Sequence, residues 1–398
     1  MHLTKRIRFR ATLLLSLVVS LALLSCRAQA DVAFCGGQFI SVPFTDVAGN
    51  PFFCQIAEAY FSGLTNGTTA TTYTPSQNVP REQMAAFVTR TLDQSLKRGS
   101  QRAPLEQNWT IQTPNNLTST TVFTGPLQVK SDGADVWVAN NGSHFVSRVR
   151  ASDGKLLDTW TGATDAYGVL CAMGKVFVTG ASSTDGKLYQ IDPRQTAGAV
   201  TTLSSGLDVG PRGIAFDGQR IWTANSGGSV SIITLNPIIV INVGNGFTFP
   251  NGLVYDGSNI WVTDYSDGKI KKLDSNGNIL TSTVTGSGPS HPTFDGTNIW
   301  VPNNVANTVA VVRAVGALSG TVLATLTGNG LNGPRQAAFD GERILVTNDA
   351  DSVSLWKASD LSLIGNFPTG AGTEPWGACS DGINFWITFR LVNKVVRF

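Results

Sequence analysis

The residues best suited to binding chemistry recur at intervals of about forty positions in the C-terminal two-thirds of the chain. They stand near the start of each interval and are Tyr167, Arg212, Asn251, His291, Arg335, Gln336 and Trp376. An indole can stack on the flat face of a sugar, and guanidinium and amide groups donate hydrogen bonds to hydroxyl or acidic groups. If the fold gathers these side chains at one mouth, they form a ligand-binding ring. The alternative is an ordinary polar rim around a water-filled channel.

Groups that could transfer protons or hold metal ions are few. Beyond residue 30 the histidines are His144 and His291, whereas general acid–base catalysis draws mostly on histidine and carboxylate side chains. The sequence holds no glycine-rich phosphate loop, zinc-ligand spacing or serine-centred nucleophile motif. These patterns favour a binding protein without a cofactor over an enzyme.

Two acidic stretches, Asp264 to Asp267 (DYSD) and Asp349 to Asp351 (DAD), offer clustered oxygens that would suit a calcium ion. Each follows a strand-like segment, at a place where Asp, Asn and Ser commonly form turns. We interpret both stretches as turns, and we expect no metal site.

A sequence repeat positions these residues. Each unit has an entrance that is usually led by proline, an apolar stretch ending in Asp-Gly, a short polar turn and a second apolar stretch, as in GIAFDGQRIWTAN and GLVYDGSNIWVTD. The turn glycines lie 39 to 45 residues apart, which is the period of a four-stranded propeller blade. They are Gly133, Gly174, Gly218, Gly257, Gly296, Gly341 and Gly382. We therefore predict an all-β fold, a seven-bladed β-propeller over residues 115–398.

A tryptophan follows the turn glycine by four residues in five of the seven units, and Leu345 takes its place in a sixth. The five are Trp137, Trp222, Trp261, Trp300 and Trp386. A large apolar side chain at one fixed phase of a repeat is typical of core packing, so we expect these residues to fill the seams between blades.

The last unit is too short to form a blade alone. It begins at Pro375 and holds 24 residues. Residues 115–125 (NNLTSTTVFTG) closely resemble the fourth strand of the fourth unit (NILTSTVTGSG). We predict that this segment completes the last blade and closes the ring.

Cys171 and Cys379 fall on the innermost strands of units two and seven. Because unit one separates them, we expect them on the order of 10 Å apart, beyond the disulfide reach of about 7 Å. The sequence therefore predicts two free thiols.

The WVT[ND] strand resembles the YVTN-type propeller repeats, and the P-x-G-[IL]-x-x-D-G frame is similar to NHL and virginiamycin B lyase propellers. The resemblance covers about 280 residues and implies the fold more strongly than an activity. The lyase family uses histidines and a glutamate around a magnesium ion. An enzyme of the lyase or lactonase kind is therefore the alternative hypothesis, with His291, His144 and Glu374 as its candidate residues.

The first 30 residues have the pattern of a signal peptide. A basic start is followed by an apolar run from Ala11 to about Leu24, and Ala28 and Ala30 stand at the cleavage positions. The run of about 14 residues is short for a permanent membrane span, so we expect export and no transmembrane span in the mature chain. Leu23 to Cys26 (LLSC) also resembles a lipoprotein box, which leaves lipidation of Cys26 as the alternative.

Residues 31–97 form a predicted small helical domain, and residues 98–114 a linker. A helical pattern covers Phe53 to Phe61, and a second begins near Arg81. In an exported protein Cys35 and Cys54 are candidates for a disulfide. The formal net charge of +2 gives no field that would favour nucleic acid as a partner.

This domain resembles an S-layer homology (SLH) domain in four ordered motifs, FTDV at 44–47, GLTNG at 63–67, YTP at 73–75 and PREQ at 80–83. Pro80 departs from the usual threonine, and a single unit is present where the family often has three. The resemblance implies non-covalent attachment to cell-wall polysaccharide or peptidoglycan, with Arg81 contacting the glycan. The alternative is that Arg81 is a solvated residue in a first helical turn. Our leading hypothesis is an exported, non-catalytic envelope protein whose propeller presents a face to a protein or glycan partner.

Overall fold

The computed structural model describes residues 30–35, 38–61, 65–80, 84, 115–116 and 123–398. The chain divides into two compact units, Met1–Lys97 and Arg98–Phe398. The predicted signal peptide, Cys26, Arg81 and the predicted linker lie outside the described residues. No helix in the described part of the chain has the length and apolar character needed to cross a bilayer.

In its described residues, the N-terminal unit contains a β-hairpin and the helix α2. Strands β1 (Val32–Cys35) and β2 (Gln38–Ser41) pair antiparallel, and α2 spans Phe53–Phe61, the same residues as the predicted helical pattern. Cys35 and Cys54 form a disulfide that joins β1 to the first turn of α2. The hairpin was not predicted. Most of the second predicted helix lies outside the described residues, although its exposed Met84 is described.

The FTDV motif holds the N-terminal unit together. Phe44 and Val47 are fully buried in its core, and the Asp46 carboxylate accepts backbone hydrogen bonds from Tyr73 at 2.8 Å and from Thr74 at 2.7 Å. The motif residues therefore fasten the start of the unit to the segment that carries the YTP motif.

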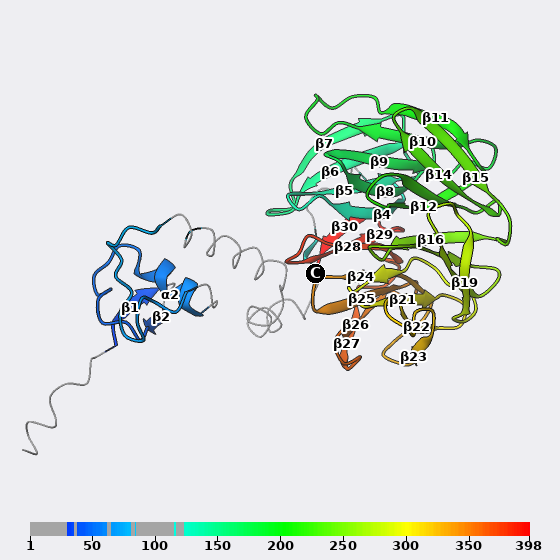
Figure 1. The fold of residues 1–398 in the computed structure, drawn as a ribbon. Coiled ribbons are helices and arrows are strands. Elements are labelled where there is room, and N and C mark those ends of the chain that lie inside the picture. The colour runs from blue at the N-terminus through cyan, green and yellow to red at the C-terminus, as the bar shows by residue number, and fades with distance from the viewer. Residues whose placement is uncertain (1–29, 36–37, 62–64, 81–83, 85–114, 117–122) are drawn as a thin grey trace, which may run out of the picture. The chain divides into compact units, whose positions relative to one another are not determined.

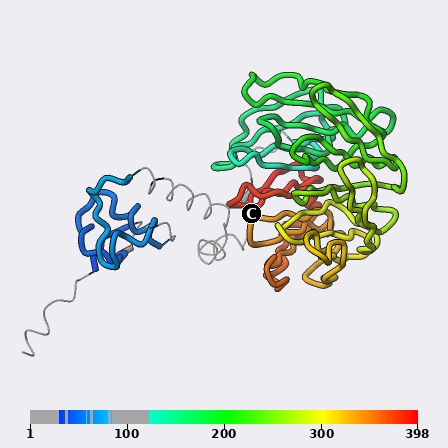
Figure 2. Tube along the Cα trace, in the orientation of Figure 1, coloured from blue at the N-terminus to red at the C-terminus, as the bar shows by residue number. Residues whose placement is uncertain are grey.

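The C-terminal unit is a seven-bladed β-propeller of four-stranded antiparallel blades, as the repeat predicts (Figure 1). The inner strands of successive blades pack side by side. Figure 2 shows the red C-terminal blade lying beside the cyan first blade, where β28 contacts β4.

In the first six blades the strands follow chain order from the centre outward. Blade one contains β4 (Pro126–Ser131), β5 (Asp135–Asn140), β6 (Phe145–Arg150) and β7 (Leu156–Thr161). Blade two contains β8 (Ala166–Ala172), β9 (Lys175–Gly180), β10 (Gly186–Ile191) and β11 (Thr201–Leu207). Blade three contains β12 (Pro211–Phe216), β13 (Ile221–Asn225), β14 (Ser229–Leu235) and β15 (Ile238–Val243). Blade four contains β16 (Pro250–Tyr255), β17 (Ile260–Asp264), β18 (Lys269–Leu273) and β19 (Ile279–Val284).

The remaining blades complete the ring. Blade five contains β20 (Thr293–Phe294), β21 (Asn298–Asn303), β22 (Thr308–Arg313) and β23 (Val322–Leu326). Blade six contains β24 (Pro334–Phe339), β25 (Arg343–Asn348), β26 (Ser352–Lys357) and β27 (Leu363–Pro368). Blade seven contains β28 (Pro375–Ser380), β29 (Phe385–Phe389), β30 (Lys394–Arg397) and β3 (Asn115–Asn116). Strand β3 pairs antiparallel with β30, so the start of the propeller supplies the outer strand of its last blade.

Apolar clusters join each described blade to the next. Trp300 of blade five, for example, is fully buried against Ile344 and Val346 of blade six. The other predicted tryptophans lie in the equivalent seams, which confirms their expected place in the core. Phe177 takes that place in blade two.

Hydrogen bonds link the seams to the Asp-Gly turns. All five seam tryptophans donate the indole N–H to the turn aspartate of their own blade, at 2.7 to 2.9 Å. In blade four the same carboxylate, that of Asp256, also accepts the backbone N–H groups of Ser258 and Asn259. The aspartate of the D-G-x-x-x-W pattern therefore stabilises the turn and orients the seam tryptophan, because its carboxylate accepts hydrogen bonds from the turn backbone and from the indole.

The inner strands approach one another closely at the centre. A Cβ atom on Gly168 would lie 2.2 Å from the carbonyl oxygen of Arg212, and one on Gly377 would lie 2.2 Å from that of Leu127. Only glycine permits this distance between neighbouring backbones. The close approach gathers the inner strands around a central channel.

Candidate functional site

One residue from each blade contributes to a ring around the channel. In six blades it is the second residue of the inner strand, and in blade five it is His291, just before β20. These residues are Leu127, Tyr167, Arg212, Asn251, His291, Arg335 and Trp376. Six of them are predicted site residues, which occupy the same place in successive blades. Leu127 is the blade-one member that sequence reasoning missed, because an aliphatic side chain carries no chemical signal. Gln336 lies one residue further along β24, where it donates to the carbonyl of Ala378 at 2.8 Å.

Tyr167 and His291 meet across the channel. They come from blades two and five, and Tyr167 Oη lies 3.4 Å from His291 Nε2, with the ring centroids 5.9 Å apart. Both side chains are buried, with 7% and 6% exposure. Because these blades lie on opposite sides of the ring, the contact spans the channel.

The environment of His291 keeps its imidazole neutral. Burial lowers the pKa of His291 to about 3, and the positive charges of Arg212, Arg335 and Lys130 act in the same direction. Burial also raises the pKa of Tyr167. The pair is therefore uncharged at neutral pH and poorly suited to proton transfer.

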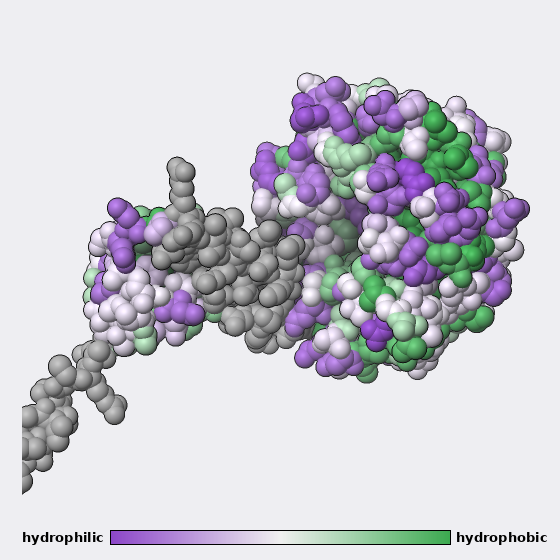
Figure 3. All heavy atoms as spheres, viewed as in Figure 1, coloured by the Kyte–Doolittle hydropathy of each residue, from purple (hydrophilic) through white to green (hydrophobic). Residues whose placement is uncertain are grey.

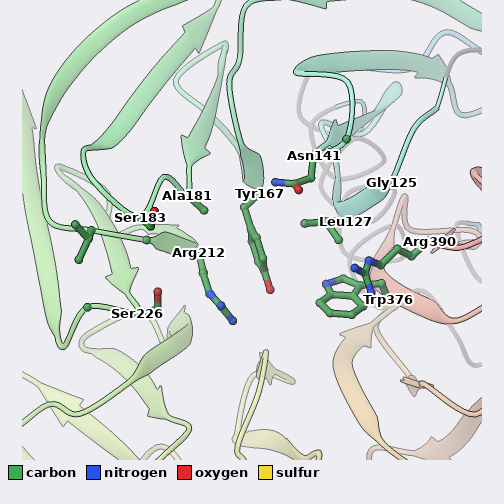
Figure 4. Close-up of a pocket in the computed structure, with 14 residues that line it drawn as sticks. Gly125, Leu127, Asn141, Tyr167, Ala181, Ser183, Arg212, Ser226, Trp376 and Arg390 are labelled. Carbon is green, nitrogen blue, oxygen red and sulfur yellow. The ribbon is translucent and has the colours of Figure 1, made fainter.

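A pocket opens at the mouth of the channel over blades seven, one, two and three (Figure 4). We call it the mouth pocket; its volume is about 590 Å³ and fourteen residues line it. Leu127, Tyr167 and Trp376 form an apolar cluster at its base. Its other lining residues are Gly125, Asn141, Gly142, Ala181, Ser183, Val209, Gly210, Arg212, Ser226, Gly227 and Arg390, most of which are small or polar.

Guanidinium groups lie over the aromatic rings of the site. The Arg335 and Arg390 guanidinium carbons lie 4.0 and 4.9 Å from the Trp376 ring centroid. Arg212 lies 5.5 Å from the Tyr167 ring. Trp376 is only 9% exposed, so its ring orients the arginines and does not offer an open stacking face to a sugar. These cation–π contacts hold the guanidinium groups in fixed positions.

Two of these arginines are neutralised by carboxylates. Arg335 Nε pairs with Asp349 at 2.6 Å, and Arg390 pairs with Glu374 at 3.0 Å. Glu374 is therefore engaged at the rim by an arginine.

The three candidate residues of the enzyme alternative are not assembled into one site. His144 is exposed and its Nδ1 accepts the backbone N–H of Asp165 at 3.1 Å, whereas His291 contacts Tyr167. Within the described ranges, no three His, Cys, Asp or Glu side chains come close enough to hold a metal ion.

The acidic stretches have protein partners. The carboxylate of fully buried Asp264 pairs with the Lys271 ammonium at 2.6 Å, so a lysine lies where a cation would bind. Asp351 accepts the backbone N–H groups of Gly372, Thr373 and Glu374. Both aspartates therefore organise loops.

The channel wall keeps unused hydrogen-bonding groups. Among the described residues, Asn251 Oδ1, Gln336 Oε1 and Gln128 Nε2 are buried without a hydrogen-bond partner. Gln128 and Gln336 stand where blades two, three, four and seven have glycine, which is the signal that would have identified Gln128 from sequence. These atoms give the wall capacity for polar ligands or water.

The two propeller cysteines are free thiols. Burial raises the pKa of Cys171 to about 12 and also raises that of Cys379. Both side chains are therefore protonated and unreactive at neutral pH.

The outer surface of the propeller carries exposed apolar side chains, whereas most residues that line the mouth pocket are small or polar. Figure 3 shows apolar side chains toward the right-hand edge of the propeller, where Figure 1 places β15 and β19. Ile239 and Ile241 of β15 are 50% and 55% exposed, and Val284 of β19 is 67% exposed. These are outer strands of their blades, so the apolar patch belongs to the rim of the ring.

The fold and the ring of inner-strand residues define a seven-bladed propeller with a polar, arginine-bearing mouth. Virginiamycin B lyase from Staphylococcus aureus, solved as an inactive variant with quinupristin, has this fold (TM-score 0.60, 19% identity, 72% of this chain and 97% of that chain). A streptogramin B lyase structure is also similar (TM-score 0.57, 17% identity, 71% and 95%). So is the WD40 propeller of Doa1 (TM-score 0.59, 12% identity, 72% and 96%). At these identities the likeness concerns the fold alone.

No protein-family model matches the chain, and no curated protein matches it with a significant score.

Proposed function

We propose that this chain is an exported, non-catalytic envelope protein whose N-terminal unit attaches to cell-wall glycan and whose mouth pocket binds a glycan or protein partner. The observation that carries the binding role is the make-up of the mouth pocket. The Arg212 and Arg390 guanidinium groups lie over the rings of Tyr167 and Trp376. Tyr167 at the base of the pocket contacts His291, which is buried and neutral. Such a site has groups for recognition and lacks an exposed proton-transfer group.

Filling the mouth pocket tests the binding role. Ser183 is exposed and lines the pocket, so Ser183→Trp is expected to reduce retention of soluble wall polysaccharide by the full chain at least tenfold. Ser359→Trp, at an exposed turn between β26 and β27, is the matched control and is expected to bind normally. Equal retention by both variants would place binding elsewhere.

The attachment role rests on the SLH resemblance and on Arg81. A guanidinium fork suits acidic groups of a wall glycan, so Arg81→Ala is expected to release most of the full mature chain from sedimented peptidoglycan. Arg194→Ala, which removes an exposed arginine of the propeller, is expected to remain bound. If the wild-type chain stays in the supernatant, the attachment proposal is wrong.

The alternative is ring opening of cyclic esters by a propeller enzyme. The lyase structures support it through the fold alone, and the positions of His144 and Glu374 give it no assembled site. Turnover of a cyclic ester that disappears in His291→Ala would replace our proposal with this one.

A further inference from the structure

One arginine of the mouth pocket has no counter-charge. Arg212 is half-buried, and its guanidinium carbon lies 4.8 Å from the Phe249 ring and 5.5 Å from the Tyr167 ring. Among the described residues, no carboxylate pairs with this guanidinium and no hydrogen bond reaches it; its side-chain contacts are those with the two rings. The two rings fix its position while its N–H groups stay available.

Blade six shows an arginine at the same position with a counter-charge. Arg335 occupies the same place in blade six, and the Asp349 carboxylate pairs with it at 2.6 Å. Asp349 directly follows Asn348, the last residue of β25. The second strand of that blade therefore supplies the counter-charge for the arginine on the first.

Blade three has the same frame without the acid. Asn225 ends β13 and donates to two serines, four and six residues later, as Asn348 does in blade six. The residue after Asn225 is Ser226, so a serine stands in the position of Asp349. Ser226 lines the mouth pocket together with Arg212.

The charged residues that line the mouth pocket also favour an anionic ligand. Two of its fourteen lining residues are arginines and none is acidic. Arg390 is paired with Glu374, which leaves Arg212 as the cation available to a ligand. Asn141, Ser183 and Ser226 add hydroxyl and amide groups at the same mouth.

We propose that Arg212 binds a carboxylate of the ligand, and that the ligand is an acidic sugar. This inference rests on the proposed binding function of the mouth pocket. The ligand carboxylate takes the place that Asp349 fills beside Arg335, since a guanidinium fork matches a carboxylate in two parallel hydrogen bonds. The neighbouring serine and asparagine side chains suit sugar hydroxyls.

Calorimetry with the full mature chain tests the proposal. The probes are trigalacturonic acid, N-acetylmuramic acid and N-acetylneuraminic acid, each compared with its methyl ester. At least one acid is expected to bind, and its ester about 10- to 100-fold more weakly, because the ester loses a charge-assisted hydrogen bond. Arg212→Gln is expected to weaken binding of the acid to the level of the ester.

Ser226→Asp is the sharper variant, because it keeps Arg212 and supplies the internal carboxylate that blade six already has. It is expected to abolish acid binding while leaving the melting temperature unchanged or higher. Arg194→Gln, outside the mouth, is expected to bind like the wild type.

The outcomes separate this inference from the binding function. Failure of all three acids, equal binding of acid and ester, or tighter binding of a tripeptide with a free C-terminal carboxylate would overturn the acidic sugar. A ligand that is lost in Ser183→Trp but retained in Arg212→Gln and Ser226→Asp would overturn the role of Arg212 and leave the mouth pocket as a binding site.

Discussion

Replacing Lys271 by methionine is expected to lower the free energy of unfolding by about 3 to 5 kcal/mol. The Lys271 side chain is 3% exposed, that of Asp264 is fully buried, and their charged atoms lie 2.6 Å apart. Methionine preserves most of the packing but leaves the Asp264 carboxylate without a counter-charge in a region of low polarity. Urea unfolding at pH 7 measures the loss.

The double variant Lys271→Met, Asp264→Asn is the control, because it also removes the Asp264 charge. Asp267, the second partner of Lys271, keeps its ion pair with Lys269 at 2.8 Å. The double variant is expected to be more stable than Lys271→Met alone. Burial raises the pKa of Asp264, but the bonds from Lys271, Thr248 and Phe249 outweigh it and hold that pKa below its ordinary value of 3.8. The wild-type pair therefore stabilises the fold above pH 3.8 and loses this contribution as the pH falls further. A single variant that loses less than about 1 kcal/mol would contradict the assigned role of the pair.

The second large effect is a loss of stability on mild acidification, caused by His291. Its folded pKa of about 3 lies below the ordinary value of 6.5. Between these values the unfolded chain binds a proton that the folded chain does not, so stability falls as the pH falls. From pH 6.5 to pH 4.5 the loss attributable to His291 is expected to be about 2 to 3 kcal/mol.

His291→Gln is expected to remove this part of the pH dependence, because glutamine does not titrate in that range. His144→Gln, at an exposed site, is expected to keep the wild-type pH dependence. Unfolding free energies at both pH values measure the difference between the variants. If His291→Gln loses as much stability as the wild type, the imidazole is not buried in its neutral form.

The propeller could be predicted because the same turn and strand pattern recurs seven times, at intervals of about forty residues. The turn glycine and the second residue of each inner segment recur once in every repeat, and the seam tryptophan recurs in five of the seven, so the ring of site residues followed from the repeat. The β1–β2 hairpin was missed because its strands have four residues each, too few to set an alternating pattern apart from a loop.

Contacts between blades and between strands were beyond sequence reasoning. Nothing in the sequence pairs Tyr167 with His291, because the ring must close before blades two and five face each other. The partner of Asp264 was also missed, since Lys271 becomes its neighbour only through the pairing of β17 with β18. Trp376 was expected as a stacking face, but Arg335 lies over its ring. Ser226 and Asp349 occupy equivalent positions in blades three and six, and the structure shows that the residue at this position can pair with the inner-strand arginine.

The most direct test of non-catalytic binding measures both whether one ligand binds and whether it is chemically changed. The full mature chain is incubated with soluble acidic wall polysaccharide, and mass spectrometry is applied to the bound and released glycan. We expect saturable binding that Ser183→Trp abolishes, with the glycan released unchanged. Conversion of the glycan to a product at a rate that depends on His291 would contradict a binding protein and identify an enzyme.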